Sequence, residues 1–134
     1  MLYEYPLTVP AGTAADAPAE LDVKLTAGVI TRIECDFAQG CNHYVYAYVR
    51  QGLHQIWPLN PDGQARGNGA VIGSDEYYEI SADVNDLTVG AYSPGATYDH
   101  EIHFRIEITP KDIAEIGKNS EGLITKVLAL LGVG

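Results

Sequence analysis

Strict alternation of apolar and polar residues near the end of the chain is its clearest structural signal. In His100–Ile108, isoleucine or phenylalanine occupies every second position, and charged or polar residues fill the positions between. Because successive side chains of a β-strand point to opposite faces, this pattern predicts a strand with one buried face. Similar or weaker alternation predicts further strands, at Leu21–Leu25, Val29–Phe37, His43–Arg50, Leu53–Trp57 and Leu87–Ala91.

Glycine and proline separate these runs, and no helical period lies between them. Asn60–Gly63 has the Pro and Gly of a tight turn and opens a loop over Gln64–Gly69, and Thr26–Gly28 is short enough to join its flanking strands as a hairpin. Short strands with turns and no intervening helices are typical of antiparallel sandwiches and barrels. The sequence therefore predicts a mainly β protein, an antiparallel sandwich of seven or eight strands related to jelly rolls or Greek keys.

The length of 134 residues fits one compact domain, and the pattern divides it into three parts. An N-terminal arm covers residues 1–19, in which Leu2–Val9 is expected to add an edge strand to its own sheet or to that of an adjoining subunit. The sandwich covers residues 20–109. A helical tail covers residues 110–134.

The tail is expected to hold two helices. Thr109 as N-cap and Pro110 at the first helical position start a short one through Ile116, and Gly117 ends it. The second, Glu121–Leu131, is apolar nearly all round. A helix of that length must bury its apolar side to persist, either on its own sandwich or on another subunit, which we favour. Its candidate interface residues are Leu123, Ile124, Val127, Leu128 and Leu131.

Tyrosines give the chain a second candidate contact surface. In His43–Arg50, one face carries small apolar residues, and the other carries Tyr44, Tyr46 and Tyr48. An outward row of tyrosines is expected either to be covered by another sheet or chain, or to form an aromatic binding surface. Trp57 is expected to anchor the loop that follows it in the core, with ligand stacking as the alternative.

The net charge limits which classes of partner are expected, and the absence of targeting features limits the expected location of the protein. A formal net charge of −10 repels phosphate backbones and anionic lipid, so neither nucleic acid nor a membrane is expected as a partner. The first twenty residues lack the features of a secretory signal, and no apolar run is long enough to span a bilayer. These observations fit a protein made and kept in the cytoplasm, or packed into a larger particle.

No catalytic or metal-binding pattern emerges, so we expect no enzyme and no cofactor. The four histidines lack the spacing of a metal site, and no serine lies in a nucleophile elbow. The carboxylate pairs, Asp75 with Glu76 and Asp83 with Asp86, are expected in or beside turns, where solvation explains them. Cys35 and Cys41 are expected as free thiols, with a local disulfide as the alternative.

Four segments together resemble a small β-sandwich type found among structural proteins of tailed bacteriophages: Phe37–Cys41, His54–Gly63, Glu76–Glu79 and His100–Ile108. The resemblance covers roughly residues 20–108 and assigns no active residue. It implies a virion component, foremost a capsid decoration (cement) protein, otherwise a small tail or neck protein. It further implies a homo-oligomer, with a trimer as the expected form, that contacts the major capsid protein or another virion protein.

The sequence thus leads to a non-enzymatic virion protein that stabilises a shell through contacts between subunits. The alternative is a carbohydrate-binding, lectin-like domain for host adsorption, in which exposed tyrosine and tryptophan rings stack on sugars. In that alternative Trp57 and Tyr92 are the rings expected to contact the glycan.

Overall fold

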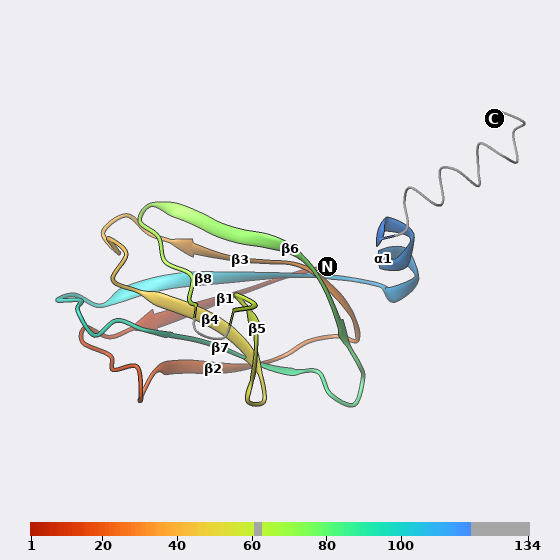
Figure 1. Cartoon of the computed structure of the whole chain (residues 1–134), viewed down its shortest axis with the longest axis horizontal. Coiled ribbons are helices and arrows are strands. Elements are labelled where there is room, and N and C mark those ends of the chain that lie inside the picture. Colours follow the sequence, from red (N-terminus) through yellow and green to blue (C-terminus); the bar gives the residue numbers. More distant parts are fainter. Residues whose placement is uncertain (61–62, 119–134) are drawn as a thin grey trace, which may run out of the picture.

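The computed structural model of the protein describes residues 1–60 and 63–118 (Figure 1). Within this part the chain forms eight strands and one helix. In chain order these are β1 (Leu2–Val9), β2 (Ala19–Lys24), β3 (Gly28–Phe37), β4 (Tyr46–Gln51), β5 (His54–Trp57), β6 (Ala70–Ile80), β7 (Asp86–Tyr92), β8 (His100–Thr109) and α1 (Lys111–Lys118).

The strands form two antiparallel sheets of four strands each, packed face to face. One sheet, sheet A, has the order β1-β8-β3-β6, and the other, sheet B, has the order β2-β7-β4-β5. Alternate strands along the chain therefore fall in opposite sheets over much of the fold, which is the arrangement of a jelly roll. The predicted mainly β, antiparallel sandwich is confirmed.

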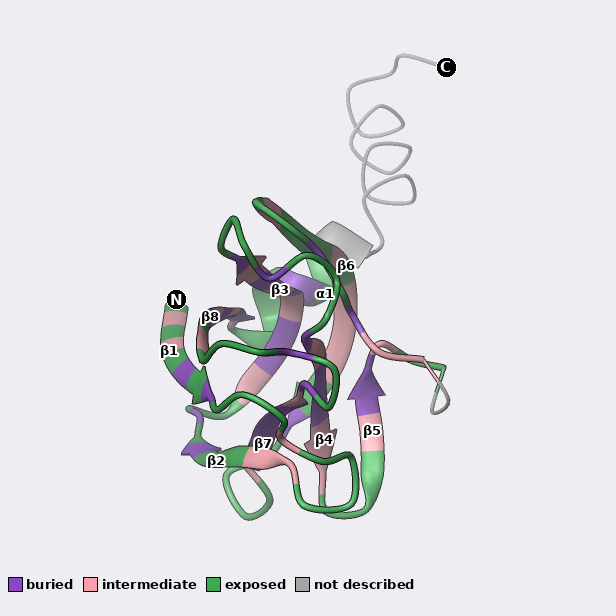
Figure 2. Ribbon diagram, turned by 90° about the vertical axis from the view of Figure 1, so that its left-hand side faces the viewer, coloured by how far each residue is buried: buried purple, intermediate pink, exposed green. Residues whose placement is uncertain are grey.

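The core lies between the sheets and follows the alternation that the sequence shows. On β8 the apolar positions are buried, whereas the polar positions between them are half-buried or exposed. The neighbouring strand β3 shows buried and half-buried bands in the same way (Figure 2). The predicted inward face of β4 is likewise buried. The largest fully buried side chains are those of Phe37, Phe104, Ile30, Ile33, Leu87, Ile102 and Ile106.

The expected hairpin around Thr26–Gly28 is wrong, because the strands on its two sides belong to different sheets. β2 pairs with β7 in sheet B, and β3 pairs with β6 and β8 in sheet A. The short segment between them is a corner that carries the chain from one sheet to the other. A three-residue connection fits either geometry, and the pairing with distant strands decides between them.

Two strand boundaries also differ from the sequence prediction. β4 begins at Tyr46, three residues later than expected, because Asn42 and His43 adopt positive φ values of 50° and 63° that interrupt an extended chain. Asp75 and Glu76 do not lie at a turn but within β6, which is eleven residues long. Carboxylates are poor strand formers locally, but pairing of β6 along β3 overrides that preference.

The N-terminal strand joins its own sheet. β1 pairs with β8 over its whole length, from Leu2 opposite Glu107 to Val9 opposite His100. The outer face of this pair adds a hydrogen-bonding contact, in which His103 Nδ1 lies 3.1 Å from Glu4 Oε1. Of the two possibilities that the sequence left open for this segment, the structure shows pairing within the chain.

The helix that follows β8 differs from its prediction at both ends. The predicted N-cap residue, Thr109, is the last residue of β8, and its hydroxyl contacts the Thr31 hydroxyl at 3.0 Å. Pro110 precedes the helix instead of occupying its first position, and its carbonyl accepts the first helical hydrogen bond, from Ala114 N. Gly117 lies inside α1, which continues to Lys118, since one glycine costs a helix only about 1 kcal/mol. The predicted second helix, Glu121–Leu131, lies outside the described residues.

No helix in residues 1–60 and 63–118 has the length and apolar character needed to cross a membrane.

Candidate functional site

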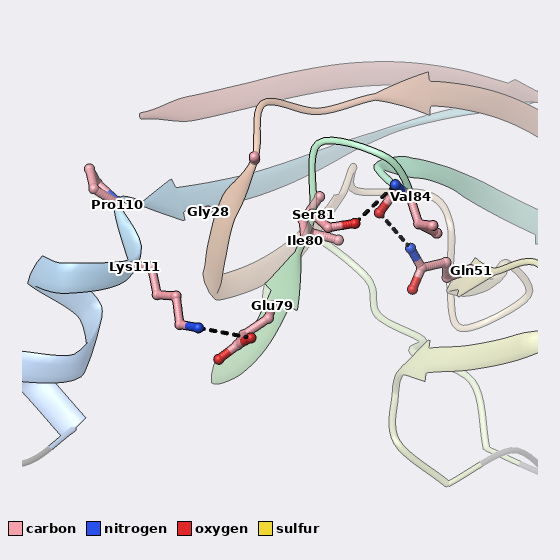
Figure 3. Close-up of a pocket in the computed structure, with 9 residues that line it drawn as sticks. Gly28, Gln51, Glu79, Ile80, Ser81, Val84, Pro110 and Lys111 are labelled. Carbon is pink, nitrogen blue, oxygen red and sulfur yellow. Dashed lines mark hydrogen bonds and ion pairs between the residues drawn. The ribbon is translucent and has the colours of Figure 1, made fainter.

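A surface hollow of about 590 Å³ lies at the end of the sandwich where α1 begins (Figure 3). Its polar groups already contact one another: Lys111 Nζ lies 3.6 Å from Glu79 Oε2, and Val84 N donates to Ser81 Oγ at 3.0 Å. On the opposite wall, Gln51 Nε2 donates to the carbonyl of Val84 at 3.2 Å. Neither a histidine nor a cysteine is among the described residues that line this hollow.

The helix beside this hollow exposes apolar surface. α1 packs its small Ala114 against the body, and that residue is buried. Ile113 and Ile116 are 56% and 53% exposed. Figure 1 shows α1 beyond one end of the two sheets, where no described element covers its outer side. The sequence-predicted interface residues Leu123, Ile124, Val127, Leu128 and Leu131 lie outside the described residues.

The three predicted tyrosines of the second contact surface have different environments. Tyr44 is 47% exposed. The Tyr46 ring is half-buried and stacks on Tyr92 with ring centroids 5.0 Å apart, and the Arg66 guanidinium lies 4.4 Å above the Tyr46 ring. Tyr48 is buried on its own sheet, because its ring lies over Gly90.

A charged network fixes Tyr48 in that position. Its hydroxyl donates to Glu20 Oε2 at 2.8 Å, and the same carboxylate accepts from Arg50 Nε and Nη2. Burial and the neighbouring carboxylate raise the pKa of Tyr48 well above its usual range. Tyr48 is therefore held within the chain, and Tyr44, Tyr46 and Tyr92 are the rings that reach the surface of sheet B.

Trp57 lies in the core, as the first of its two sequence interpretations expects. It is only 3% exposed, and its indole Nε1 donates to Ser74 Oγ at 3.0 Å. Ser74 in turn donates to Glu76 Oε1 at 2.7 Å. The indole borders a second hollow of about 430 Å³, between the loop at Gln64–Arg66 and strand β6. A ring this deeply buried cannot stack on a sugar.

The outer face of sheet A is densely charged and acidic. Arg105 contacts Asp36 at 3.1 Å, Glu34 at 3.4 Å and Glu4 at 3.6 Å, which links strands β1, β3 and β8. Arg32 contacts Glu34 and Asp75 in the same way. Within residues 1–60 and 63–118, no group of three or more histidine, cysteine or carboxylate side chains is arranged to hold a metal ion.

Both cysteines are buried free thiols, so the local disulfide is absent. Burial raises the pKa of Cys35 far above its usual range and raises the pKa of Cys41 as well. A thiol must ionise to act as a nucleophile, and burial opposes that step in both residues.

Comparison with known proteins assigns no family. No protein-family model matches the chain, and no curated protein matches it. Among solved structures, a de novo designed double-stranded β-helix matches with 16% identity and a TM-score of 0.40, covering 78% of this chain and 99% of that one. A CBM4 structure matches with 15% identity and a TM-score of 0.41, covering 79% and 81%.

A subunit of Bacillus endospore appendages, described as disulfide-linked pili, matches with 11% identity and a TM-score of 0.37, covering 83% of this chain and 88% of that one. At these values none of the three assigns a function to this chain.

Proposed function

We propose that this protein is a non-enzymatic structural subunit that assembles through contacts with other chains. In finer terms, we propose a capsid decoration protein of a virion, a homo-oligomer that also contacts the major capsid protein. The observation that carries the proposal is the exposed apolar side of α1, formed by Ile113 and Ile116 at one end of the sandwich.

The energetics of α1 support assembly. A helix of eight residues is marginal in water by itself, and within residues 111–116 of α1 the small Ala114 is the one buried residue. Full burial of an isoleucine side chain contributes about 1.5–3 kcal/mol, so covering two half-exposed isoleucines on each subunit would stabilise an assembly appreciably. The sequence after α1 continues this apolar character from Leu123 to Leu131.

The chemistry of the surface agrees with a role in assembly. The polar groups around the hollow beside α1 contact one another, both thiols are buried, and the outer face of sheet A is a network of ion pairs. These features stabilise a rigid body. An acidic body of this kind suits attachment to protein rather than to nucleic acid.

The test compares the mass of the full chain in solution with that of the variant Ile113→Lys/Ile116→Lys, by light scattering after size-exclusion chromatography. We expect the native chain to exceed its monomer mass of 14.5 kDa and the variant to lose mass. The matched control is Leu53→Lys, which changes a fully exposed leucine on the β4–β5 turn. A variant with the native mass, or a native chain that is monomeric, would overturn the proposal.

A second candidate, carbohydrate binding, is favoured by the rings on sheet B. Tyr46 and Tyr92 form a rigid stacked pair, and exposed Tyr44 lies on the same segment. Aromatic rings on a rigid sheet can stack on the apolar faces of sugars. A glycan array with hits that Tyr92→Ala abolishes, and that Tyr98→Ala at a separate exposed tyrosine leaves intact, would favour this role over assembly.

A further inference from the structure

The four edge strands of the sandwich differ in how they are protected against pairing with another chain. An edge strand presents unpaired backbone groups, and proteins block such edges with proline, charge or short length. In sheet A, β1 carries Pro6 near its middle. In sheet B, β2 carries the charged side chains of Glu20, Asp22 and Lys24, and β5 is only four residues long.

Strand β6 lacks these protections over its first half. It is the outermost strand of sheet A and the longest of the eight described strands, at eleven residues. Residues 70–74 contain no charge and no proline, and Val71 and Ile72 are 48% and 37% exposed. A long, apolar and exposed edge of this kind is a template for strand addition.

A hollow lies beside this unprotected edge. The cavity of about 430 Å³ is bordered by Ile72, Gly73 and Ser74 on one side, and by Trp57 and the loop Gln64–Arg66 on the other. Ile72 pairs with inward-facing Cys35 and therefore belongs to the inner face of sheet A. An added strand at β6 would direct its own inward side chains toward this hollow.

From these observations we propose that β6 pairs with β6 of a second copy, antiparallel and centred on Gly73, joining two A sheets into one of eight strands. In this register Ile72 lies opposite Ser74 of the second copy, and Val71 lies opposite its Asp75. Ile72 of each copy then points toward the hollow beside Trp57 of the other. The contact is isologous, as a twofold axis requires.

The distribution of charge and the length of the paired segment favour this register among the symmetric alternatives. The carboxylates of β6, Asp75, Glu76 and Glu79, all lie in its second half. A twofold axis at Asp75 would place that carboxylate opposite its own copy, which destabilises a strand pair. Axes at Ile72, Gly73 and Ser74 all avoid opposing carboxylates, but the axis at Ile72 pairs only residues 70–74 and the axis at Ser74 places Ile72 opposite the Glu76 carboxylate. The axis at Gly73 pairs residues 70–76 and places Ile72 opposite a serine.

The test uses substitutions of opposite charge at the same exposed position. Val71→Asp places a carboxylate opposite Asp75 of the second copy, and Val71→Lys places an ammonium group there. Because the twofold axis repeats the pair, we expect Val71→Asp to weaken the dimer about tenfold or more and Val71→Lys to preserve or strengthen it. Leu2→Asp, on the proline-blocked edge β1, is the control and should leave the dimer unchanged.

The measurement is sedimentation equilibrium at about 0.15 M and about 0.5 M salt, because copies with a net charge of −10 repel each other less at high salt. Working in the Ile113→Lys/Ile116→Lys background separates this contact from the proposed contact of α1. The pairing is supported if the protein forms a dimer in that background, if Val71→Asp dissociates this dimer, and if Val71→Lys leaves it intact. A monomer at every concentration, or a dimer that ignores both substitutions, overturns it.

Fluorescence gives an independent readout, since Trp57 is the only tryptophan of the chain. If Ile72 of the second copy approaches the hollow, dimer formation should shift the emission of Trp57. Emission that stays constant across a dissociation curve would contradict the proposed register even if a dimer forms.

Discussion

The ring of Tyr48 lies over the backbone of Gly90 on the outer face of sheet B, so closely that a Cβ at residue 90 would fall 2.5 Å from its Cζ. Strands β4 and β7 pair with these two residues opposite each other. The absence of a side chain at Gly90 lets the phenol cross β7 and reach Glu20 on β2. One glycine thus allows a single aromatic side chain to connect three strands of the sheet.

This relationship predicts that Gly90→Ala is destabilising although it adds only a methyl group. The ring must move away, which breaks the hydrogen bond to Glu20 and exposes the ring, so we expect a loss of about 1–3 kcal/mol in the free energy of unfolding. Urea denaturation followed by circular dichroism measures it. Gly95→Ala is the control, because a Cβ there meets the Tyr44 ring at 3.4 Å, an ordinary contact. Equal stability of both variants would contradict the prediction.

The hydrogen bond between Trp57 and Ser74 gives a second prediction. Ser74→Ala leaves the buried indole N–H without its acceptor, and an unsatisfied buried donor costs about 1–3 kcal/mol. Thermal denaturation should show this loss, and Trp57 emission should change with it. In a Trp57→Phe background the same serine substitution should cost much less, because no indole donor remains. Equal costs in both backgrounds would mean that the serine stabilises the protein by another route.

Much of the fold follows from local pattern, because the spacing of apolar residues determines which face of each strand is buried. Ile102, Phe104 and Ile106 show this, since alternation alone places them in the core. The same rule identified the inward face of β4. Periodicity of this kind depends only on the geometry of an extended chain. The buried face of a strand can therefore be predicted without knowing which strands pair with it.

Long-range pairing accounts for what the sequence did not predict. The corner at Thr26–Gly28 has the composition of a hairpin turn, and only the pairing of β2 with β7 shows otherwise. No strand is predicted from the sequence at β6, whose first half contains Gly73 and follows the glycine-rich loop Gln64–Gly69. Its strand conformation comes from β3, whose residues from Arg32 to Phe37 pair with it.

In the candidate contact surface, too, local pattern predicts the side on which a residue lies but not its neighbours. Alternation correctly placed Tyr44, Tyr46 and Tyr48 on the outward side of their segment, but it could not show what lies next to each ring. Tyr48 meets a glycine on β7 and a carboxylate on β2, and both come from distant parts of the sequence. Whether the exposed rings contact another chain stays a prediction.

The buried thiol of Cys35 predicts a loss of stability in alkaline solution. Burial raises its pKa in the folded protein above the unfolded value of about 9, so only the unfolded state releases the proton as the pH rises. The contribution is present below pH 9 and is lost above it, by about 1.4 kcal/mol between pH 8 and pH 10 for a thiol that stays protonated when folded. Urea denaturation at both pH values measures the difference.

Cys35→Ala separates this effect from other titrations. The variant is less stable at both pH values because it leaves a cavity, but its stability should fall less steeply between them. A slope identical to that of the native chain would show that another group causes the alkaline loss.

The ion pairs of Arg105 lead to a prediction of how much the charged face of sheet A contributes to the stability of the fold. Its guanidinium lies among carboxylates of β1 and β3, so Arg105→Gln removes the cation that separates Glu4, Glu34 and Asp36. We expect a loss of about 1 kcal/mol at low salt, because partly exposed ion pairs are weak singly and gain from forming a network. Thermal denaturation at about 0.05 M and about 0.5 M salt measures it, and screening should shrink the loss at the higher concentration.

The control is Lys24→Gln, which removes the same charge from a residue with no ion pair in the described part of the chain. If both variants lose stability equally, the effect belongs to net charge, and the network around Arg105 does not hold β1 to the sandwich.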